Sequence, residues 1–226
     1  MSDATIAYTQ EPTKAKPTVI RLAMIGPWTI LIALALAFIA AYAARYFVHF
    51  DEATFGPYWP RRPALLLHIG AGIVALLTAP FQFWNGYRRM PMVVHRWTGR
   101  AFVGSVTVGS AGALYLAITT TFGWAFGFAT MMMNLAWIST TAMAYYAIRR
   151  RLIAVHKEWM VRAYAVTFAF VTIRLFNDVL PTSQLAGPEL AITLPWASWA
   201  LPLLATELIL QLKHIHNAGE RIPTCS

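Results

Sequence analysis

The chain has 226 residues, of which 58% are hydrophobic and only 12% are charged. A soluble domain carries about 25% charged residues, so this composition excludes an ordinary soluble domain and indicates helices that cross a lipid bilayer. The formal net charge is +9, but the basic residues stand between apolar stretches, which is typical of membrane loops and not of a nucleic-acid interface. The single cysteine, Cys225, excludes an internal disulfide and a cysteine-based metal cluster.

The hydropathy of the sequence predicts an all-α integral membrane protein with six transmembrane helices. A polar N-terminal tail, residues 1–21, precedes the membrane domain, residues 22–212, and a C-terminal tail covers residues 213–226. A spanning helix needs about 20 apolar residues. Six segments meet this condition, near Leu22–Phe47, Pro63–Trp84, His95–Thr119, Trp124–Ile148, His156–Leu180 and Glu189–Leu212. Pro195 and Pro202 are expected to kink the last of them.

The positions of Lys and Arg predict the orientation. If the N-terminus is cytoplasmic, 14 of the 18 Lys and Arg residues fall on the inner segments. Cytoplasmic loops of membrane proteins carry such an excess. We therefore expect both tails to face the cytoplasm, which requires an even number of spans.

Two of the inner segments share a sequence pattern. Residues Val94–Arg100 read VHRWTGR, and residues Val155–Arg162 read VHKEWMVR. An internal repeat would explain the pattern, with helices two–three and four–five as related hairpins and with His95 and His156 at equal depth. Alternatively, both loops converged on the same interfacial anchors, because Trp, Arg and Lys are favoured there.

Small and polar residues form narrow stripes along the second to fifth helices. These stripes predict a four-helix core, flanked by the first and sixth helices. Asn134 is expected to be buried near the middle of the bilayer as a link between helices. Arg174 and Asp178 lie one turn apart in the fifth helix and are expected to pair inside the bundle. The alternatives for Arg174 are a snorkelling salt bridge and a site for an anionic group, such as a propionate, a quinone oxygen or a lipid phosphate.

The histidines suggest a haem b site. His95 and His156 are candidate axial ligands of one iron, because imidazole is a neutral nitrogen donor and membrane bundles hold haem between imidazoles on neighbouring helices. Arg100 and Arg162 stand beside them and are candidates to hold a propionate. His68 is a candidate ligand of a second, looser site toward the outside. The alternative is that these histidines only anchor the helices at the interface.

Four motifs resemble the bacterial family of membrane proteins called domain of unknown function 2306. They are HIGAG at residues 68–72, APFQFW at residues 79–84, HRWTGR at residues 95–100 and HKEWMVRAY at residues 156–164. The resemblance covers Ala64 to Leu180 and implies a multi-pass protein of the bacterial inner membrane, without an activity or a substrate. The segment HRWTGR is also loosely similar to helix starts of transmembrane di-haem cytochromes b.

Two classes of function remain open. The first is a haem-b electron carrier, with quinone or a membrane redox protein as its partner. The second is a cofactor-free protein that transports a small solute or serves as an accessory or sensor subunit. The sequence contains no phosphate-binding loop, HExxH motif or CxxC motif, so it names no catalytic residue and leaves open whether the protein is an enzyme.

Overall fold

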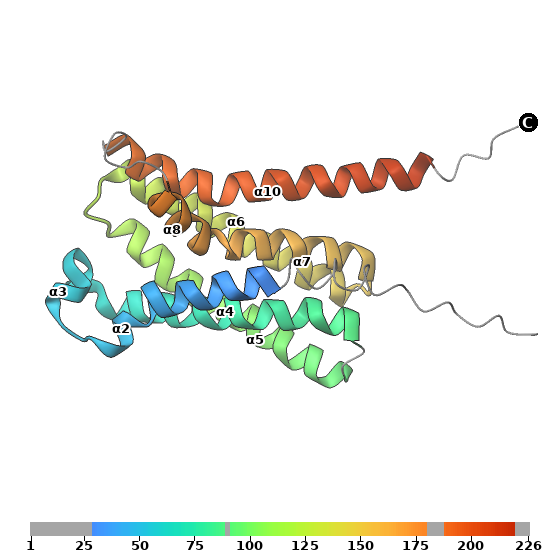
Figure 1. Ribbon diagram of the computed structural model, residues 1–226, viewed down its shortest axis with the longest axis horizontal. Coiled ribbons are helices and arrows are strands. Elements are labelled where there is room, and N and C mark those ends of the chain that lie inside the picture. The colour runs from blue at the N-terminus through green and yellow to red at the C-terminus, as the bar shows by residue number, and fades with distance from the viewer. Residues whose placement is uncertain (1–28, 89–90, 180–187, 220–226) are drawn as a thin grey trace, which may run out of the picture.

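The computed structural model is an elongated bundle of helices (Figure 1). The structure describes residues 29–88, 91–179 and 188–219, and these residues contain no β-strand. Its long helices are α4 (Arg62–Arg88), α5 (Met92–Ile118), α6 (Trp124–Arg149), α7 (Ile153–Thr167), α8 (Ala169–Val179) and α10 (Pro188–Gly219). The prediction of an all-α fold is confirmed.

Short helices precede α4 at one end of the bundle. The first described segment is helical from Thr29 to Ala43, and its last turn is the π-helix η1 (Ile39–Ala43). It is followed by α2 (Arg45–Val48), α3 (Glu52–Phe55) and the 3₁₀-helix η2 (Gly56–Arg61). We call this end the α3 end, and we call the end with the turn between α6 and α7 the opposite end (Figure 1).

Asp51 starts α3. Its carboxylate accepts a hydrogen bond of 2.8 Å from the backbone N–H of Thr54. This bond caps the helix and holds the pKa of the Asp51 carboxyl below its usual value. The chain therefore turns from α2 into α3 through a capped helix start.

The described residues contain fewer candidate membrane spans than the six that the sequence predicts. Three described segments have the length and hydropathy to cross a membrane: Glu52–Thr78, Met92–Ile118 and Ile192–Ala218. The pair α7 and α8 would be a fourth, so six spans are not confirmed. The first predicted span is described only from Thr29 onward, and α6 has 26 residues but contains Asn134 and several hydroxyl groups, which lower its hydropathy.

The fifth predicted helix is broken. The sequence predicts one helix over residues 156–180, whereas α7 and α8 meet at Phe168 with a bend of 41°. At the end of α7, the hydroxyl of Thr167 donates a hydrogen bond of 2.8 Å to the carbonyl of Ala163. A threonine bound to the preceding turn in this way favours a bend. Leu180 lies outside the described residues.

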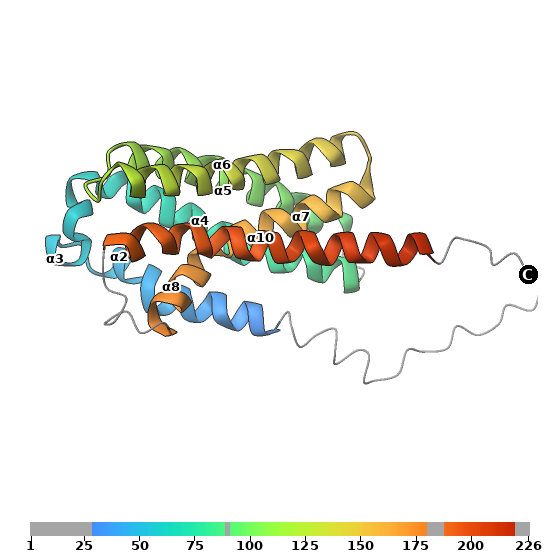
Figure 2. The ribbon, with the colours of Figure 1, turned by 90° about the horizontal axis from the view of Figure 1, so that it is seen from above.

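The sixth predicted helix is longer than expected. It begins at Pro188 and continues to Gly219 as α10, with Pro195 and Pro202 inside it. α10 packs against α6, α7 and α8 on one side of the bundle (Figure 2). The two expected kink points therefore lie within one continuous helix.

The core forms where α4, α5, α6 and α7 meet. Its buried cluster consists of Ala75, Phe102, Val106, Trp137, Ala163, Tyr164 and Val166. Glycines bring α5 close to α4, since a Cβ atom on Gly112 would lie only 2.8 Å from the carbonyl oxygen of Ala64. The structure thus contains the four-helix core that the small-residue stripes predict.

Candidate functional site

A cavity of about 520 Å³ opens between the helices toward the α3 end. Pockets that hold small molecules in proteins commonly measure about 300–1,000 Å³. Most of its wall is aromatic or aliphatic, including Phe38, Ile73, Phe126, Phe170 and Ile173. A few polar side chains interrupt this wall, among them His68, Asn134 and Arg174. The cavity therefore combines an apolar interior with a small number of polar groups, which is the usual composition of a ligand site.

His68 of α4 lines this cavity with one ring nitrogen already bonded. Its Nδ1 lies 2.9 Å from the carbonyl oxygen of Gly109 on α5. A carbonyl oxygen only accepts hydrogen bonds, so Nδ1 carries the proton and Nε2 of the neutral ring keeps a lone pair. In the part of the chain that the structure describes, Nε2 has no hydrogen-bond partner, so it is available as an acceptor.

Two aromatic side chains hold the ring of His68. The ring centroid lies 6.3 Å from Trp137 and 5.1 Å from Phe170, both in edge-on geometry. Trp137 is only 2% exposed, and its indole N–H donates a hydrogen bond of 2.8 Å to the hydroxyl of Thr167. This bond joins α6 to the last residue of α7, so the wall behind His68 is fixed by both helices.

Arg174 of α8 lines the cavity near η1. Its guanidinium carbon lies 5.3 Å from the ring centroid of Tyr42, and the hydroxyl of Tyr42 donates a hydrogen bond to Asp178. The prediction that Arg174 and Asp178 pair directly is wrong. No ion pair joins them among the described residues, and the hydroxyl of Tyr42 from η1 binds Asp178 instead. Asp178 is also exposed rather than buried, and Arg174 is half-buried.

The guanidinium of Arg174 keeps its hydrogen-bonding capacity. Its contact with Tyr42 uses the face of the aromatic ring. Among the contacts of the described residues, none is a hydrogen bond from Arg174. An arginine has five N–H donors, so this side chain can bind an acceptor group inside the cavity.

Asn134 of α6 is 6% exposed and also lines the cavity. Its Nδ2 donates a hydrogen bond of 3.2 Å to the carbonyl of Ser110 on α5, so it links two helices. Because that carbonyl can only accept, the amide orientation is fixed and Oδ1 points elsewhere. Oδ1 is buried and has no hydrogen-bond partner among the described residues.

His95 and His156 lie at the opposite end, near the starts of α5 and α7, and away from His68. Nδ1 of His156 lies 2.9 Å from the carbonyl oxygen of Ala144, which leaves its Nε2 with a lone pair. The structure therefore places two of the three predicted histidines at this end of the bundle and the third in a separate site.

The two arginines beside these histidines have the same local geometry. The guanidinium carbon of Arg100 lies 4.9 Å from the ring centroid of Trp97, and that of Arg162 lies 4.8 Å from the ring centroid of Trp159. These matching stacks are what related hairpins would produce. Arg100 is exposed, however, whereas the side chain of Arg162 is 11% exposed.

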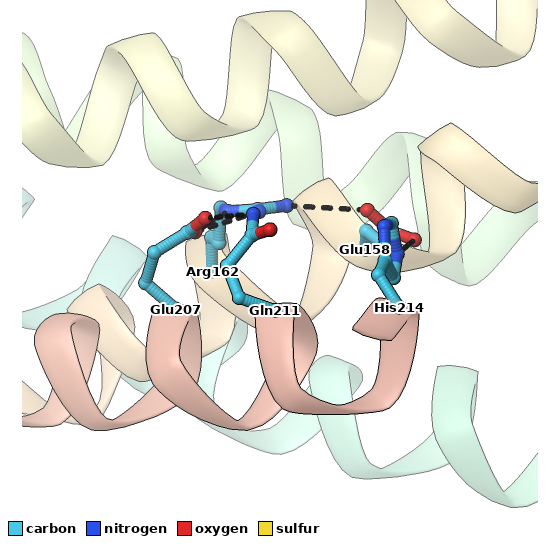
Figure 3. A network of polar contacts seen from close by, with 5 residues as sticks. All are labelled: Glu158, Arg162, Glu207, Gln211 and His214. Carbon is cyan, nitrogen blue, oxygen red and sulfur yellow. Dashed lines mark hydrogen bonds and ion pairs between the residues drawn. The ribbon is translucent and has the colours of Figure 1, made fainter. Parts of the chain in front are cut away.

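The guanidinium of Arg162 forms ion pairs with two carboxylates. Its Nε and Nη2 lie 2.8 and 2.6 Å from Oε2 of Glu207, and its Nη1 lies 3.8 Å from Glu158 (Figure 3). His214 reaches the other oxygen of Glu158 at 2.7 Å, and Gln211 donates to Glu207 at 2.7 Å. We call these five residues the α7–α10 network.

Sequence reasoning missed this network and the role of Arg61. Glu207 and His214 stand more than 40 residues from their partners, and no motif connects them. Arg61 is 7% exposed and binds the turn between α5 and α6, whereas the sequence presents it only as one of two adjacent loop arginines. Nothing in the sequence distinguishes Arg61 from Arg62.

The apolar helical bundle, in which three or four spans among the described residues have the length and hydropathy to cross a bilayer, defines an integral membrane protein. The model of a family described as predicted membrane protein, DUF2306, matches residues 65–210, and the chain belongs to this family. The match continues past Leu180 into α10. No curated protein and no solved structure matches the chain significantly, so the looser likeness to cytochromes b has no support from these comparisons.

Proposed function

We propose that this membrane protein binds a lipophilic small molecule in the cavity toward the α3 end, with a hydrogen-bond acceptor of the ligand placed at Arg174. The observation that carries the proposal is a half-buried arginine that forms no hydrogen bond with another described residue, on the wall of a largely apolar cavity of about 520 Å³. A cation in such surroundings is costly unless it has a partner. A carboxylate, a phosphate or a quinone carbonyl on the ligand would supply one.

The apolar wall determines the chemical character of the rest of the ligand. Burial of apolar surface contributes roughly 25 cal/mol per Å², so aliphatic and aromatic parts of the molecule would provide most of the affinity. A molecule with one polar head and an apolar body also partitions into the bilayer. This proposal is compatible with a transporter, a sensor or a quinone-binding subunit, because all three need such a site.

Gly72→Leu is expected to reduce the amount of bound lipophile about tenfold. Gly72 lines the cavity, and a Cβ atom on it would meet nothing within 4 Å, so the added side chain would fill empty space without meeting the backbone. The measurement is mass spectrometry of the molecules that organic solvent extracts from purified protein.

Gly104→Leu is the matched control for this experiment. Gly104 is exposed on α5, and a Cβ atom there also meets nothing within 4 Å. Its extract should match that of the wild type. A Gly72→Leu protein that retains the wild-type amount of ligand, or a wild type that carries none, would contradict the proposal.

A haem b between His95 and His156 is the second candidate, with electron transfer as the function. It is supported by the hydrogen bond of His156 to Ala144, since ligating histidines commonly donate their other N–H to a carbonyl. Arg162 does not fit the predicted role of holding a haem propionate, because its guanidinium already forms an ion pair with Glu207.

Visible spectroscopy tests the haem candidate. Protein produced with ample haem should show a Soret band that sharpens on reduction. His95→Ala and His156→Ala should each remove this band, whereas His214→Ala should leave it unchanged. Well-folded protein without colour would exclude the haem.

We also propose that the opposite end faces the cytoplasm. The exposed cations Arg149, Arg150, Arg151 and Lys157 gather there, which agrees with the excess of Lys and Arg expected on that side. Reporters fused after Ser226 or inserted at Met90 should both give cytoplasmic signals. A periplasmic signal at either site would rule out this orientation.

A further inference from the structure

We infer that His68 accepts a hydrogen bond from the ligand, so that the ligand of this cavity is a phenolic lipophile, meaning a phenol or quinol with an apolar substituent. The inference rests on the proposed binding function and names the chemical class of its ligand. It follows from which polar atoms of the cavity wall are already used and which are free.

The polar atom that His68 presents to the cavity is an acceptor. Nδ1 of His68 is bound to the carbonyl of Gly109, so its Nε2 can only accept while the ring is neutral. Asn134 donates its amide N–H to Ser110, and its Oδ1 is fully buried, so a ligand in the cavity does not reach it. A ligand with only acceptor atoms would leave Nε2 of His68 without a partner, which is costly in an apolar site.

Two hydroxyl groups on the same wall are already engaged as donors. Thr130 donates to the carbonyls of Phe126 and Gly127, each at 3.0 Å. Tyr42 donates to Asp178. These two hydroxyls therefore do not donate to the ligand, and we take the donor for Nε2 of His68 to come from the ligand itself.

The surroundings of His68 favour an aromatic hydroxyl over an aliphatic one. Trp137 and Phe170 stand edge-on around the imidazole, and Phe122 and Phe126 also line the cavity. Edge-to-face contacts among aromatic rings add to the affinity that buried area provides. A phenol therefore supplies both the hydrogen-bond donor for His68 and an aromatic ring that packs against the aromatic wall.

The second polar contact lies further along the same helix. Phe170 touches His68, and Arg174 follows Phe170 by four residues, a rise of about 6 Å. A molecule with a hydroxyl group at His68 and an acceptor oxygen toward Arg174 would use both ends of this wall. The two oxygens of a quinol ring, or a phenol with a second oxygen substituent, have this character.

The test compares 4-nonylphenol with its methyl ether. The two molecules have nearly the same shape, but only the phenol can donate a hydrogen bond. Their dissociation constants are measured with the full-length protein in detergent by the quenching of tryptophan fluorescence. The wild type is expected to bind the phenol five- to tenfold more tightly than the ether, which is the effect of one neutral hydrogen bond of about 1 kcal/mol.

Substitution of His68 locates the acceptor. His68→Phe keeps an aromatic ring and removes the acceptor, so the ratio of the two dissociation constants should fall to about one. His68→Leu serves the same purpose if the phenylalanine variant fails to fold. His214→Phe, on the exposed part of α10, should keep the wild-type ratio.

The possible results separate the two proposals. If phenol and ether bind the wild type equally, and Gly72→Leu abolishes both, the cavity is a ligand site but the inference about His68 is overturned. A preference for the phenol that persists in His68→Phe or His68→Leu overturns it as well. If neither molecule binds the wild type, the proposed function and the inference both fail.

Discussion

Replacing Arg61 with alanine is expected to lower the free energy of unfolding by about 3 kcal/mol, the largest effect that we foresee for a single side chain. Arg61 is 7% exposed. Its guanidinium donates to the carbonyl of Thr119, to the carbonyl of Pro57 at 2.7 Å and to the hydroxyl of Thr121 at 3.4 Å. These bonds attach the start of α4 to the turn between α5 and α6, and alanine would leave the two carbonyls without this donor.

The measurement is the thermal unfolding of purified protein in detergent. Arg149→Ala is the control, because Arg149 is an exposed arginine at the opposite end. Arg61→Lys should recover only part of the loss, since an ammonium group lacks the planar fork that reaches several acceptors at once. If Arg61→Ala and Arg149→Ala unfold at the same temperature, the contacts of Arg61 do not stabilise the protein.

Gly112→Ala is expected to destabilise the bundle by about 1–3 kcal/mol and to weaken ligand binding. The new Cβ atom would lie 2.8 Å from the carbonyl oxygen of Ala64 and 3.2 Å from the Cβ atom of His68. A backbone oxygen cannot move aside as a flexible side chain can, so α4 and α5 would have to separate. The separation would occur at His68, to which we assign the hydrogen bond with the ligand.

Gly104→Ala is the matched control on the same helix. A Cβ atom at Gly104 meets nothing within 4 Å, so alanine there should be neutral or stabilise α5 by up to about 1 kcal/mol through its helix propensity. Thermal unfolding and the affinity for 4-nonylphenol measure both effects. Equal stability of the two alanine variants would show that α4 and α5 do not need close approach at Gly112.

The helices were largely predictable because their signals are local. The uncharged stretch from Ala101 to Ile148, with glycines at its centre, predicts two helices, and the structure has α5 and α6 there. The break between α7 and α8 was not predictable in the same way. It falls at Phe168 within an apolar stretch that contains no Gly or Pro. It depends on the two hydrogen bonds of the Thr167 hydroxyl, which donates to the carbonyl of Ala163 and accepts from Trp137.

The candidate site was predictable only in part. Polar residues in apolar helices pointed to His68, Asn134 and Arg174, and all three line the cavity. The sequence could not show that Tyr42 would separate Arg174 from Asp178, because that contact joins residues 136 positions apart. Hydrophobic periodicity reveals which face of a helix is covered, but it does not reveal which side chain of another helix will compete for a charge.

The length of α10 determines where the α7–α10 network lies relative to the lipid. The helix has 32 residues and is therefore about 48 Å long, whereas the hydrocarbon layer is about 30 Å thick. If Pro188 stands at one boundary of that layer, Glu207 stands about 28 Å further along, at the other boundary. His214 then lies among the phospholipid headgroups. With this placement, water would reach the carboxylates of Glu158 and Glu207. The charged groups that join α10 to α7 would then lie in the hydrated zone and not in the hydrocarbon layer.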